Sequence, residues 1–345
     1  MVWTGAEPGE DAPTSDVDNV AVDHAFVTRF ERGPLRTDSG PFKWVRGAVY
    51  DSAGVLVPNS QRGWDGDALD PVAADPDRVR IPLRTRRLRG TWLYAGHWCG
   101  HFGHFLLELL PNLWPDPTTY DPPLTGVLVH HPARGPVASG GERFGLRRPE
   151  LTPWQRQLLD LAGYGAADLR VVTQRPVRVA RLLVPARPVL LKQWVRPPAV
   201  EVWQRISTAV GRRGSHPRVY LSRTRFHAGA SGARIRADQA WDTHLDTRFA
   251  EAGFAVVHPE TMSVADQIEL VRGARVLAGL SGSALHLSAF AEPGTRVLTI
   301  GDRRARKKPP PSQRMIDAAC GHRTAFVANN DEAQLSVVLS TLGEA

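Results

Sequence analysis

The sequence predicts an α/β protein of two domains, each with a Rossmann-like arrangement of strands and helices, and three observations support this. The chain has 345 residues, more than one hydrophobic core usually serves. In the second half, apolar strands alternate with helical segments, which is typical of a parallel sheet covered by helices on both faces. Between the halves, residues 187–200 are interrupted by prolines, as expected of a crossing between domains.

The first 40 residues are expected to form a disordered or irregular leader. Their opening stretch, MVWTGAEPGEDAPTSDVDNV, is acidic and polar and lacks the apolar core of a signal peptide. An N-terminal domain is expected over residues 41–195 and a C-terminal domain over residues 196–345. Because no export signal is evident, Cys99 and Cys320 are expected to be reduced thiols of a cytoplasmic protein.

The N-terminal domain is expected to contain two helices. Apolar residues recur every three or four positions over residues 102–113, which predicts a helix with one buried face, and Pro111 must kink or end it. Pro153 in the first turn and a glycine near the end bound a second helix over residues 152–165. Strands are predicted at residues 41–60, as a pair around the turn 51–54, and at 89–96, 125–131 and 178–186.

The C-terminal domain has the more regular pattern. Ser263 as N-cap, with Asp266 three residues later, opens a helix. In parallel sheets, ligands bind at the carboxyl ends of the strands, so a site is expected there. The strands are predicted at residues 217–223, 254–259, 275–280 and 295–301, and the helices at 238–253, 263–274 and 283–291.

The chain is basic, with a net charge of +8 and an isoelectric point near 10.0. A positive net charge favours the binding of anionic partners. No pattern of basic residues interleaved with aromatics, and no zinc-finger or helix-turn-helix pattern, is evident, so nucleic acid is not expected as a partner. Small phosphorylated ligands fit the composition better. No stretch reaches the roughly 18 apolar residues that a membrane-spanning helix requires.

The first candidate site is the histidine-rich helix. His101, His104, Glu108 and Asn112 fall at i, i+3, i+7 and i+11, opposite the apolar face. His104 and Glu108 are i, i+4 neighbours and could form an oriented pair, which suits a general base. Each histidine could instead simply pack or cap the helix.

A zinc site is the alternative for this segment. His97, Cys99, His101 and His104 supply the ligand types, but their spacing matches no familiar structural zinc pattern.

The second candidate site is the turn after the strand at 275–280. Backbone N–H groups at Gly282, Ser283 and Ala284 would start a helix and could seat a phosphate, although tight strand–helix packing also explains the small residues. A serine hydrolase is a weaker alternative. Ser281 would be its nucleophile, with Asp302 and His322 following in the chain order of a triad, but Ser283 stands where the motif needs glycine.

The third candidate site is the arginine-rich end of the strand at 217–223. Arg223 lies at the strand end and Arg225 follows it. Arginine makes bidentate, permanently charged contacts with diphosphate, whereas a solvated loop is the alternative. Asp-x-Asp triplets occur only in polar loops, at 16–18, 65–67 and 75–77, so a metal-dependent diphosphate site is not supported.

In this order, the pieces resemble glycosyltransferase family 61 proteins (DUF563, capsular polysaccharide biosynthesis type). The N-terminal block of that family is similar to GHFLLELLPNLW at 103–114. The C-terminal blocks are similar to YLSR at 220–223, GFAVVHPE at 253–260 and SVADQIELVRGARVLAGLSGSALHLSAF at 263–290.

The resemblance implies a two-domain, GT-B-like fold. It also implies an enzyme that uses a nucleotide-sugar donor and inverts the configuration at the anomeric carbon, without a bound metal or other cofactor. Carried over by position, His104 and Glu108 would face the acceptor. Arg223, Glu260, Gly282 and Ser283 would lie near the donor nucleotide.

The expected function is therefore transfer of a sugar to a glycan or other hydroxyl acceptor. Glu108, oriented by His104, would remove the acceptor proton, and the donor diphosphate would rest against Arg223 and Gly282–Ala284. His101, Asn112, Arg225, Glu260 and Ser281 are further candidate substrate contacts. A lipid-linked acceptor would bring peripheral membrane contact. The alternatives are a serine hydrolase and a non-catalytic protein that binds nucleotide sugars.

Overall fold

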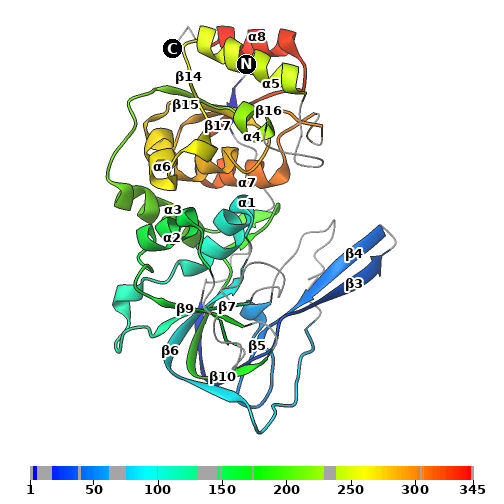
Figure 1. Ribbon diagram of the computed structural model, residues 1–345, viewed down its shortest axis with the longest axis vertical. Helices are drawn as coiled ribbons and strands as arrows, with labels where there is room; N and C mark the ends of the chain where they lie inside the picture. The colour runs from blue at the N-terminus through cyan, green and yellow to red at the C-terminus, as the bar shows by residue number, and fades with distance from the viewer. Residues whose placement is uncertain are drawn as a thin grey trace. The chain divides into compact units, whose positions relative to one another are not determined.

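The computed structural model describes residues 3–5, 18–37, 40–61, 75–98, 100–130, 146–147, 150–172, 175–228, 238–303, 305 and 307–342. The chain divides into two compact units. Unit 1 comprises Met1–Ala12 and Lys192–Ala345, and unit 2 comprises Pro13–Leu191. Each unit combines its own sheet with helices (Figure 1), which confirms the predicted mixed α/β class.

Unit 1 is built on a six-stranded sheet in the order β1-β17-β16-β15-β13-β14. Five neighbouring strands, β14, β13, β15, β16 and β17, are all parallel, as the alternating pattern predicts. The short strand β1 pairs antiparallel with β17. The bounds are β1 (Thr4–Gly5), β13 (Arg218–Leu221), β14 (Ala255–Val257), β15 (Val276–Leu280), β16 (Arg296–Ile300) and β17 (Arg323–Val327).

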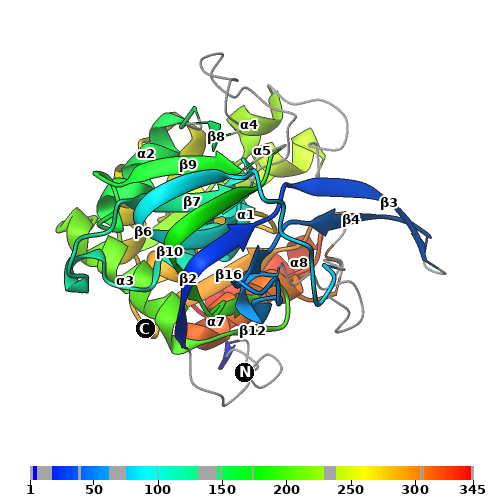
Figure 2. The ribbon, with the colours of Figure 1, turned by 90° about the horizontal axis from the view of Figure 1, so that it is seen from below.

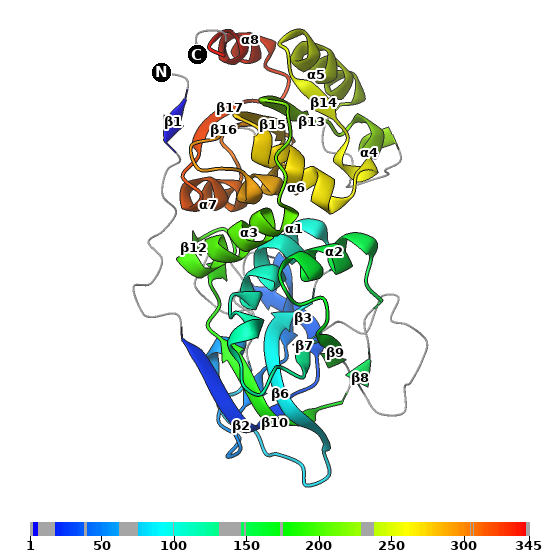
Figure 3. The same ribbon diagram turned by 90° about the vertical axis from the view of Figure 1, so that its left-hand side faces the viewer.

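Helices cover both faces of this sheet, as predicted. Figure 3 shows α5 and α8 on one side, with α6 and α7 on the other. Capping sets several of the helix starts: the Ser263 hydroxyl accepts a hydrogen bond from Asp266 N and opens α6. The bounds are α3 (Pro197–Val210), α4 (Thr224–Ala228), α5 (Gln239–Glu251), α6 (Val264–Gly273), α7 (Pro311–Ala319) and α8 (Glu332–Ser340).

One hydrophobic core cluster of unit 1 lies between the sheet and the pair α5 and α8. The ring of Tyr220 on β13 stacks on Phe249 of α5 with centroids 4.1 Å apart. Trp3, just before β1, joins the same cluster and donates from Nε1 to Thr341 Oγ1 at 3.0 Å. Trp3 and the residues at the end of α8 are therefore parts of the same core cluster.

Unit 2 has a seven-stranded sheet in the order β5-β2-β10-β6-β7-β9-β8. Figure 2 shows its middle strands side by side. Strands β10, β6, β7 and β9 are parallel, but β2 and β8 run antiparallel to their neighbours, so the sheet is Rossmann-like only in its middle. The bounds are β2 (Asn19–Val27), β5 (Val49–Tyr50), β6 (Arg86–His97), β7 (Gly126–His130), β8 (Leu146–Arg147), β9 (Asp168–Val172) and β10 (Val177–Pro185).

The remaining elements of unit 2 are short. A two-stranded ribbon joins β3 (Glu31–Thr37) to β4 (Gly40–Arg46), and α2 (Pro153–Leu161) begins with the capping box of Thr152 and Gln155. Strand β11 (Val189–Leu190) ends the unit, and β12 (Trp194–Val195) precedes α3 in unit 1.

The expectation of an irregular leader over the first 40 residues is wrong for its second half. Residues 19–27 form β2, which pairs with β10 along its length, and residues 31–37 form β3. Only Ala25, Phe26 and Val27 at the end of β2 are buried in succession. The backbone ladder holds the exposed first part of the strand in place, so its polar composition does not reveal it.

No helix among the described residues is long and apolar enough to cross a membrane.

Candidate active site

The histidine-rich segment after β6 is helical but not a regular α-helix. It begins as one α-turn, α1 (Phe102–His104), widens to a π-helical turn over Phe105–Leu109, and tightens to a 3₁₀ turn over Leu110–Leu113. Pro111, which has no N–H to donate, lies in the tight turn. The leucines of the segment are buried, and Phe105 packs edge-on against Trp98 and Trp154. The buried face therefore fixes which side chains point away from the core.

The structure brings His104 and Glu108 together. His104 Nδ1 hydrogen bonds to Glu108 Oε2, one helical turn away. The histidine side chain is 37% exposed, whereas the glutamate side chain is 9% exposed. The carboxylate is thus mostly withdrawn from water while its partner can be reached from solvent. His101 joins this pair, since its ring lies 5.3 Å from that of His104 in an edge-to-face arrangement.

Asn112 has a different role from the other three polar residues of the segment. Its side chain is buried, and Nδ2 donates to the carbonyl of Ala95 on β6 at 3.0 Å and to that of Glu108 at 2.8 Å. The amide therefore ties the helical segment to the strand. Asn112 is therefore a structural residue, and its buried side chain is not available to contact a substrate beside His104 and Glu108.

A buried polar network that the sequence did not predict lies at the ends of β6 and β7. The rings of His97 and His130 stack with centroids 5.2 Å apart. His130 Nε2 is 2.7 Å from the carbonyl of Thr28, and His130 Nδ1 is 2.7 Å from the hydroxyl of Tyr94. Since a carbonyl can only accept, Nε2 carries the proton and Nδ1 accepts from the tyrosine. Burial lowers the pKa of His130 to about 4, so the ring is neutral at pH 7.

Arg187 completes this network and argues against zinc at this place. Its Nη2 donates to His97 Nδ1 at 3.3 Å and to the carbonyl of Ser60 at 3.2 Å. A guanidinium at the imidazole repels a second cation. Cys99, another member of the zinc alternative, lies outside the described residues, and no group of three or more metal-binding side chains occurs among the residues that the structure does describe.

In unit 1, the candidate residues gather at the carboxyl ends of β13, β14 and β15. Arg223, directly after β13, is buried, and its guanidinium lies 4.6 Å from the ring centroid of Phe226. Arg225 on α4 is exposed. Glu260 is also exposed, in the short 3₁₀ turn Pro259–Thr261 after β14. Of the two arginines, only Arg223 is held in a fixed place by its surroundings.

The turn after β15 differs from the expected helix start. Leu285–Phe290 form a short 3₁₀ helix, and Leu285 N already donates to the carbonyl of Gly282 at 3.0 Å. Ser281 N donates to the carbonyl of Ile300 at 2.7 Å. A phosphate seat here would thus use the backbone of the Gly282–Ala284 turn rather than the start of a regular α-helix.

A buried histidine–carboxylate pair lies beside Arg223. His227 Nδ1 on α4 hydrogen bonds to Asp242 Oδ2 on α5. Burial, reinforced by the nearby charge of Asp246, raises the pKa of Asp242, while the hydrogen bond from His227 opposes this shift. Thr224 Oγ1 donates to Asp246 Oδ2 at 2.9 Å. No spacing in the sequence indicates this pair, because its members come from different helices.

Several buried polar atoms at this edge make no hydrogen bond within the described residues. They are the Ser281 hydroxyl after β15, His258 Nδ1 after β14, and His227 Nε2 on α4, which follows β13. An unsatisfied buried polar atom costs about 1–3 kcal/mol, so such atoms in a folded protein call for an unseen partner. The carboxyl edge of this sheet is therefore a candidate ligand site.

The triad of a serine hydrolase does not form. His322 Nε2 bonds to the carbonyl of Ser288 at 2.9 Å, and His322 Nδ1 makes no hydrogen bond within the described residues. Asp302 Oδ1 accepts from Ala305 N at 2.8 Å. A triad histidine must bond both to the carboxylate and to the serine, so the hydrolase alternative is not supported.

Parallel strands with polar side chains at their carboxyl ends are typical of α/β enzymes that act on small ligands. Residues 102–298, more than half of the chain, match the family described as Glycosyltransferase 61. The chain belongs to glycosyltransferase family 61, so the resemblance read from the sequence is confirmed, and the protein is an enzyme that transfers a sugar from a donor to an acceptor. A search of curated proteins found no significant match.

Proposed function

We propose that the protein transfers a sugar from a nucleotide-diphosphate donor to a hydroxyl group of a glycan or lipid-linked acceptor, with inversion and without a metal. In this proposal the two units act as those of a GT-B enzyme, with the donor bound by unit 1 and the acceptor by unit 2. The observation that carries it is the set of buried polar atoms, beside Arg223 at the carboxyl ends of β13, β14 and β15, that make no hydrogen bond within the described residues.

On the donor side, Arg223 would hold the diphosphate. A guanidinium makes two parallel hydrogen bonds to phosphate oxygens, and its charge does not depend on pH. The Ser281 hydroxyl and the backbone of Gly282–Ala284 would supply further donors. Glu260, exposed after β14, would accept hydrogen bonds from ribose or sugar hydroxyls. Arg225, also exposed, would lie at the rim of this site.

On the acceptor side, Glu108 would act as general base. As the acceptor oxygen bonds to the anomeric carbon, its proton moves to the Glu108 carboxylate. The bond from that carbon to the diphosphate oxygen breaks, and the diphosphate leaves with the electron pair. Hydrogen bonding to His104 Nδ1 fixes the orientation of the carboxylate, while His101 next to it would contact the acceptor. A positioned base contributes about 10²–10⁴-fold to a rate.

The test has two stages. A thermal-shift panel of nucleoside diphosphates first identifies the nucleotide that unit 1 binds, and transfer is then measured with the matching sugar donors. Glu108→Gln should lower kcat by about 10²–10⁴-fold while the dissociation constant of the nucleotide stays at the wild-type value. Glu150→Gln, which changes an exposed glutamate of the same unit, is the control. Wild-type turnover in Glu108→Gln would exclude this residue as the base.

A further inference from the structure

Helix α4, which begins directly after Arg223, is docked on α5 by two side-chain contacts. Thr224 Oγ1 donates to Asp246 Oδ2 at 2.9 Å, and His227 Nδ1 hydrogen bonds to Asp242 Oδ2. The two residues on α4 are three positions apart and the two on α5 are four apart, so each pair lies on one face of its helix. We call these two contacts the α4–α5 clasp.

The two contacts of the clasp differ in exposure. The side chains of His227 and Asp242 are 3% and 1% exposed, whereas Asp246 is half-buried. Because a buried carboxylate is costly unless it is hydrogen bonded, the first contact is the firmer one. Removal of the Thr224 hydroxyl would leave Asp246 within reach of water, so this second contact can be broken without burying an unpaired charge.

The short length of α4 explains why it needs such contacts. A helix of five residues is not stable by itself, since forming the first turn costs more than its few hydrogen bonds return. In this turn, His227 N donates to the carbonyl of Arg223 at 2.8 Å. Just before it, Ser222 N donates to the carbonyl of Val257 on β14 at 2.8 Å. The sheet therefore fixes the backbone before Arg223, and the clasp fixes the turn after it.

The side chain of Arg223 is also linked to α4 and to the clasp. Its guanidinium lies 4.6 Å from the ring centroid of Phe226, so a movement of α4 would shift the surface on which the guanidinium lies. Burial raises the pKa of Asp242, and the hydrogen bond from His227 and the positive charge of Arg223 oppose this shift. The arginine is thus close enough to act electrostatically on the clasp.

We propose that the α4–α5 clasp positions Arg223 for the diphosphate, through residues that do not touch the ligand themselves. This role rests on the proposed function, in which Arg223 binds the diphosphate of the donor. A guanidinium recognises phosphate oxygens through two parallel hydrogen bonds, whose strength depends on its orientation. A displaced α4 should therefore weaken binding although no contact to the ligand has been removed. The positioning residues are Thr224, His227, Asp242 and Asp246.

The test is a double-mutant cycle on the binding of inorganic pyrophosphate to the full chain, followed by phosphorus NMR titration. Thr224→Val and His227→Ala each open one contact and should weaken binding about five-fold when Arg223 is present. In an Arg223→Ala background, each should change the dissociation constant by less than about 1.5-fold. Equal losses in the two backgrounds, or wild-type affinity in both clasp variants, would overturn the positioning role.

A conservative variant distinguishes positioning from general packing. In His227→Asn the amide nitrogen can donate to Asp242 in place of Nδ1, so most of the affinity lost in His227→Ala should return, and equal affinity in the two variants would contradict the proposal. Thermal unfolding shows whether His227→Ala folds, and Thr224→Val carries the cycle if it does not. Thr247→Val on α5, whose hydroxyl donates to the carbonyl of Thr243, is the matched control and should bind as the wild type does.

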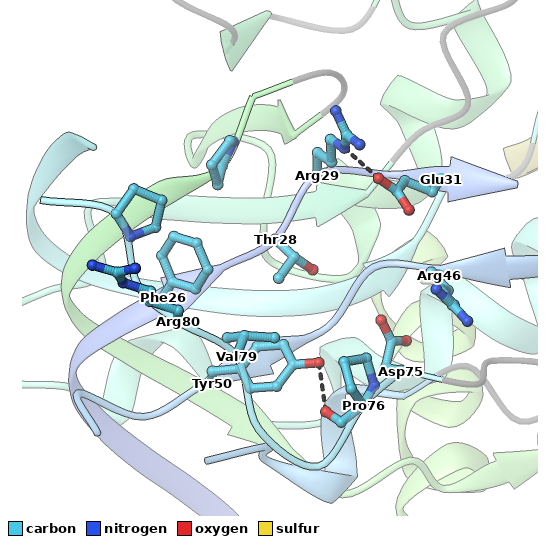
Figure 4. Close-up of a pocket in the computed structure, with 12 residues that line it drawn as sticks. Phe26, Thr28, Arg29, Glu31, Arg46, Tyr50, Asp75, Pro76, Val79 and Arg80 are labelled. Carbon is cyan, nitrogen blue, oxygen red and sulfur yellow. Dashed lines mark hydrogen bonds and ion pairs between the residues drawn. The ribbon is translucent and has the colours of Figure 1, made fainter. Parts of the chain in front are cut away.

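Further controls separate failure of the clasp from failure of the donor site. The cavity of about 390 Å³ in unit 2 also has arginines in its lining, among them Arg29 (Figure 4). Arg29→Gln should leave pyrophosphate binding unchanged, and a loss would place the pyrophosphate in unit 2 and overturn the proposal. Equal binding by the wild type and Arg223→Ala, or none by either, would contradict the donor site itself. A loss in Arg223→Ala alone would remove only the clasp role.

Discussion

His104 Nδ1 and Glu108 Oε2 are hydrogen bonded across one turn of the segment that follows β6. The histidine approaches the carboxylate through the nitrogen nearer its own backbone, so its main effect is on the direction of the Glu108 side chain. His104 is therefore a positioning residue in the proposed reaction.

His104→Ala is expected to lower kcat about ten-fold, because the carboxylate then samples several rotamers. His104→Asn should recover part of this loss, since its amide nitrogen can replace Nδ1 as a donor, whereas His104→Ala cannot. Steady-state kinetics of both variants with the matched donor and acceptor give kcat and KM separately. Equal losses in the two variants, or an effect confined to KM, would contradict the positioning role.

Arg223 provides a test of the donor side. Arg223→Ala should weaken the binding of the preferred nucleoside diphosphate about 10–100-fold, in line with the loss of a charge-assisted pair. Arg223→Lys should recover only part, because an ammonium lacks the planar fork. Titration calorimetry checks both. Arg212→Gln, an arginine 73% exposed after α3, is the control, and an unchanged dissociation constant in Arg223→Ala would rule out this contact.

The proposed reaction should not need a divalent metal. In the proposed mechanism the arginine and the backbone donors of unit 1 would take up the charge of the leaving diphosphate, so activity should persist after dialysis against EDTA. Added Mg²⁺ or Mn²⁺ should change the rate less than two-fold. Loss of transfer in EDTA that is restored by either ion would show that a cation takes part after all.

Gly96, near the end of β6, is expected to tolerate no side chain. Its φ of +85° disfavours other residues, by about 1–2 kcal/mol for a left-handed backbone, and a Cβ there would lie 2.9 Å from Asn112 Nδ2. Gly96→Ala should therefore lower both the free energy of unfolding and the activity. Gly100→Ala, where a Cβ meets nothing within 4 Å, should do neither, as urea unfolding of both variants can show.

Asp317 on α7 should make the stability of the protein depend on pH. Burial raises its pKa to about 8, although hydrogen bonds from Gln313 and Ser288 oppose the shift. Between about pH 4 and pH 8 the carboxyl is then protonated in the folded state and ionised in the unfolded chain. In that window, the contribution of this residue should lower the free energy of unfolding by about 1.4 kcal/mol for each unit by which the pH rises.

Asp317→Asn removes that dependence. The variant should be more stable than the wild type at pH 8, and the difference should shrink as the pH falls toward 5. Chemical unfolding at several pH values gives the two curves, and the difference between them cancels the contributions of all other groups. Parallel curves would show that Asp317 is ionised in the folded protein.

Four strands of unit 1 could be predicted from the sequence because they are short apolar runs that alternate with helical segments. Ser263, for example, marks the start of α6 from its side chain alone. Strand β2 could not be predicted in the same way, since only its last residues are buried and its pairing with β10 comes from the backbone.

In the candidate site, too, contacts between residues close in the sequence could be predicted, whereas contacts between distant residues could not. His104 and Glu108 lie one turn apart, so helical spacing alone predicted their contact. The stack of His97 on His130, and the contact of Arg187 with it, join residues from separate elements of the sheet. No periodicity relates such positions, and only the tertiary structure brings them together.

The pairing of β1 with β17 has a consequence for how the protein is made. Thr4 lies opposite Thr324 in the sheet of unit 1, and all of unit 2 comes between them in the chain. During synthesis, Thr4 leaves the ribosome long before its partner exists. Unit 2 can fold on the ribosome, but the edge of the unit 1 sheet must wait until Thr324 has also been made, so its formation should come after the folding of unit 2.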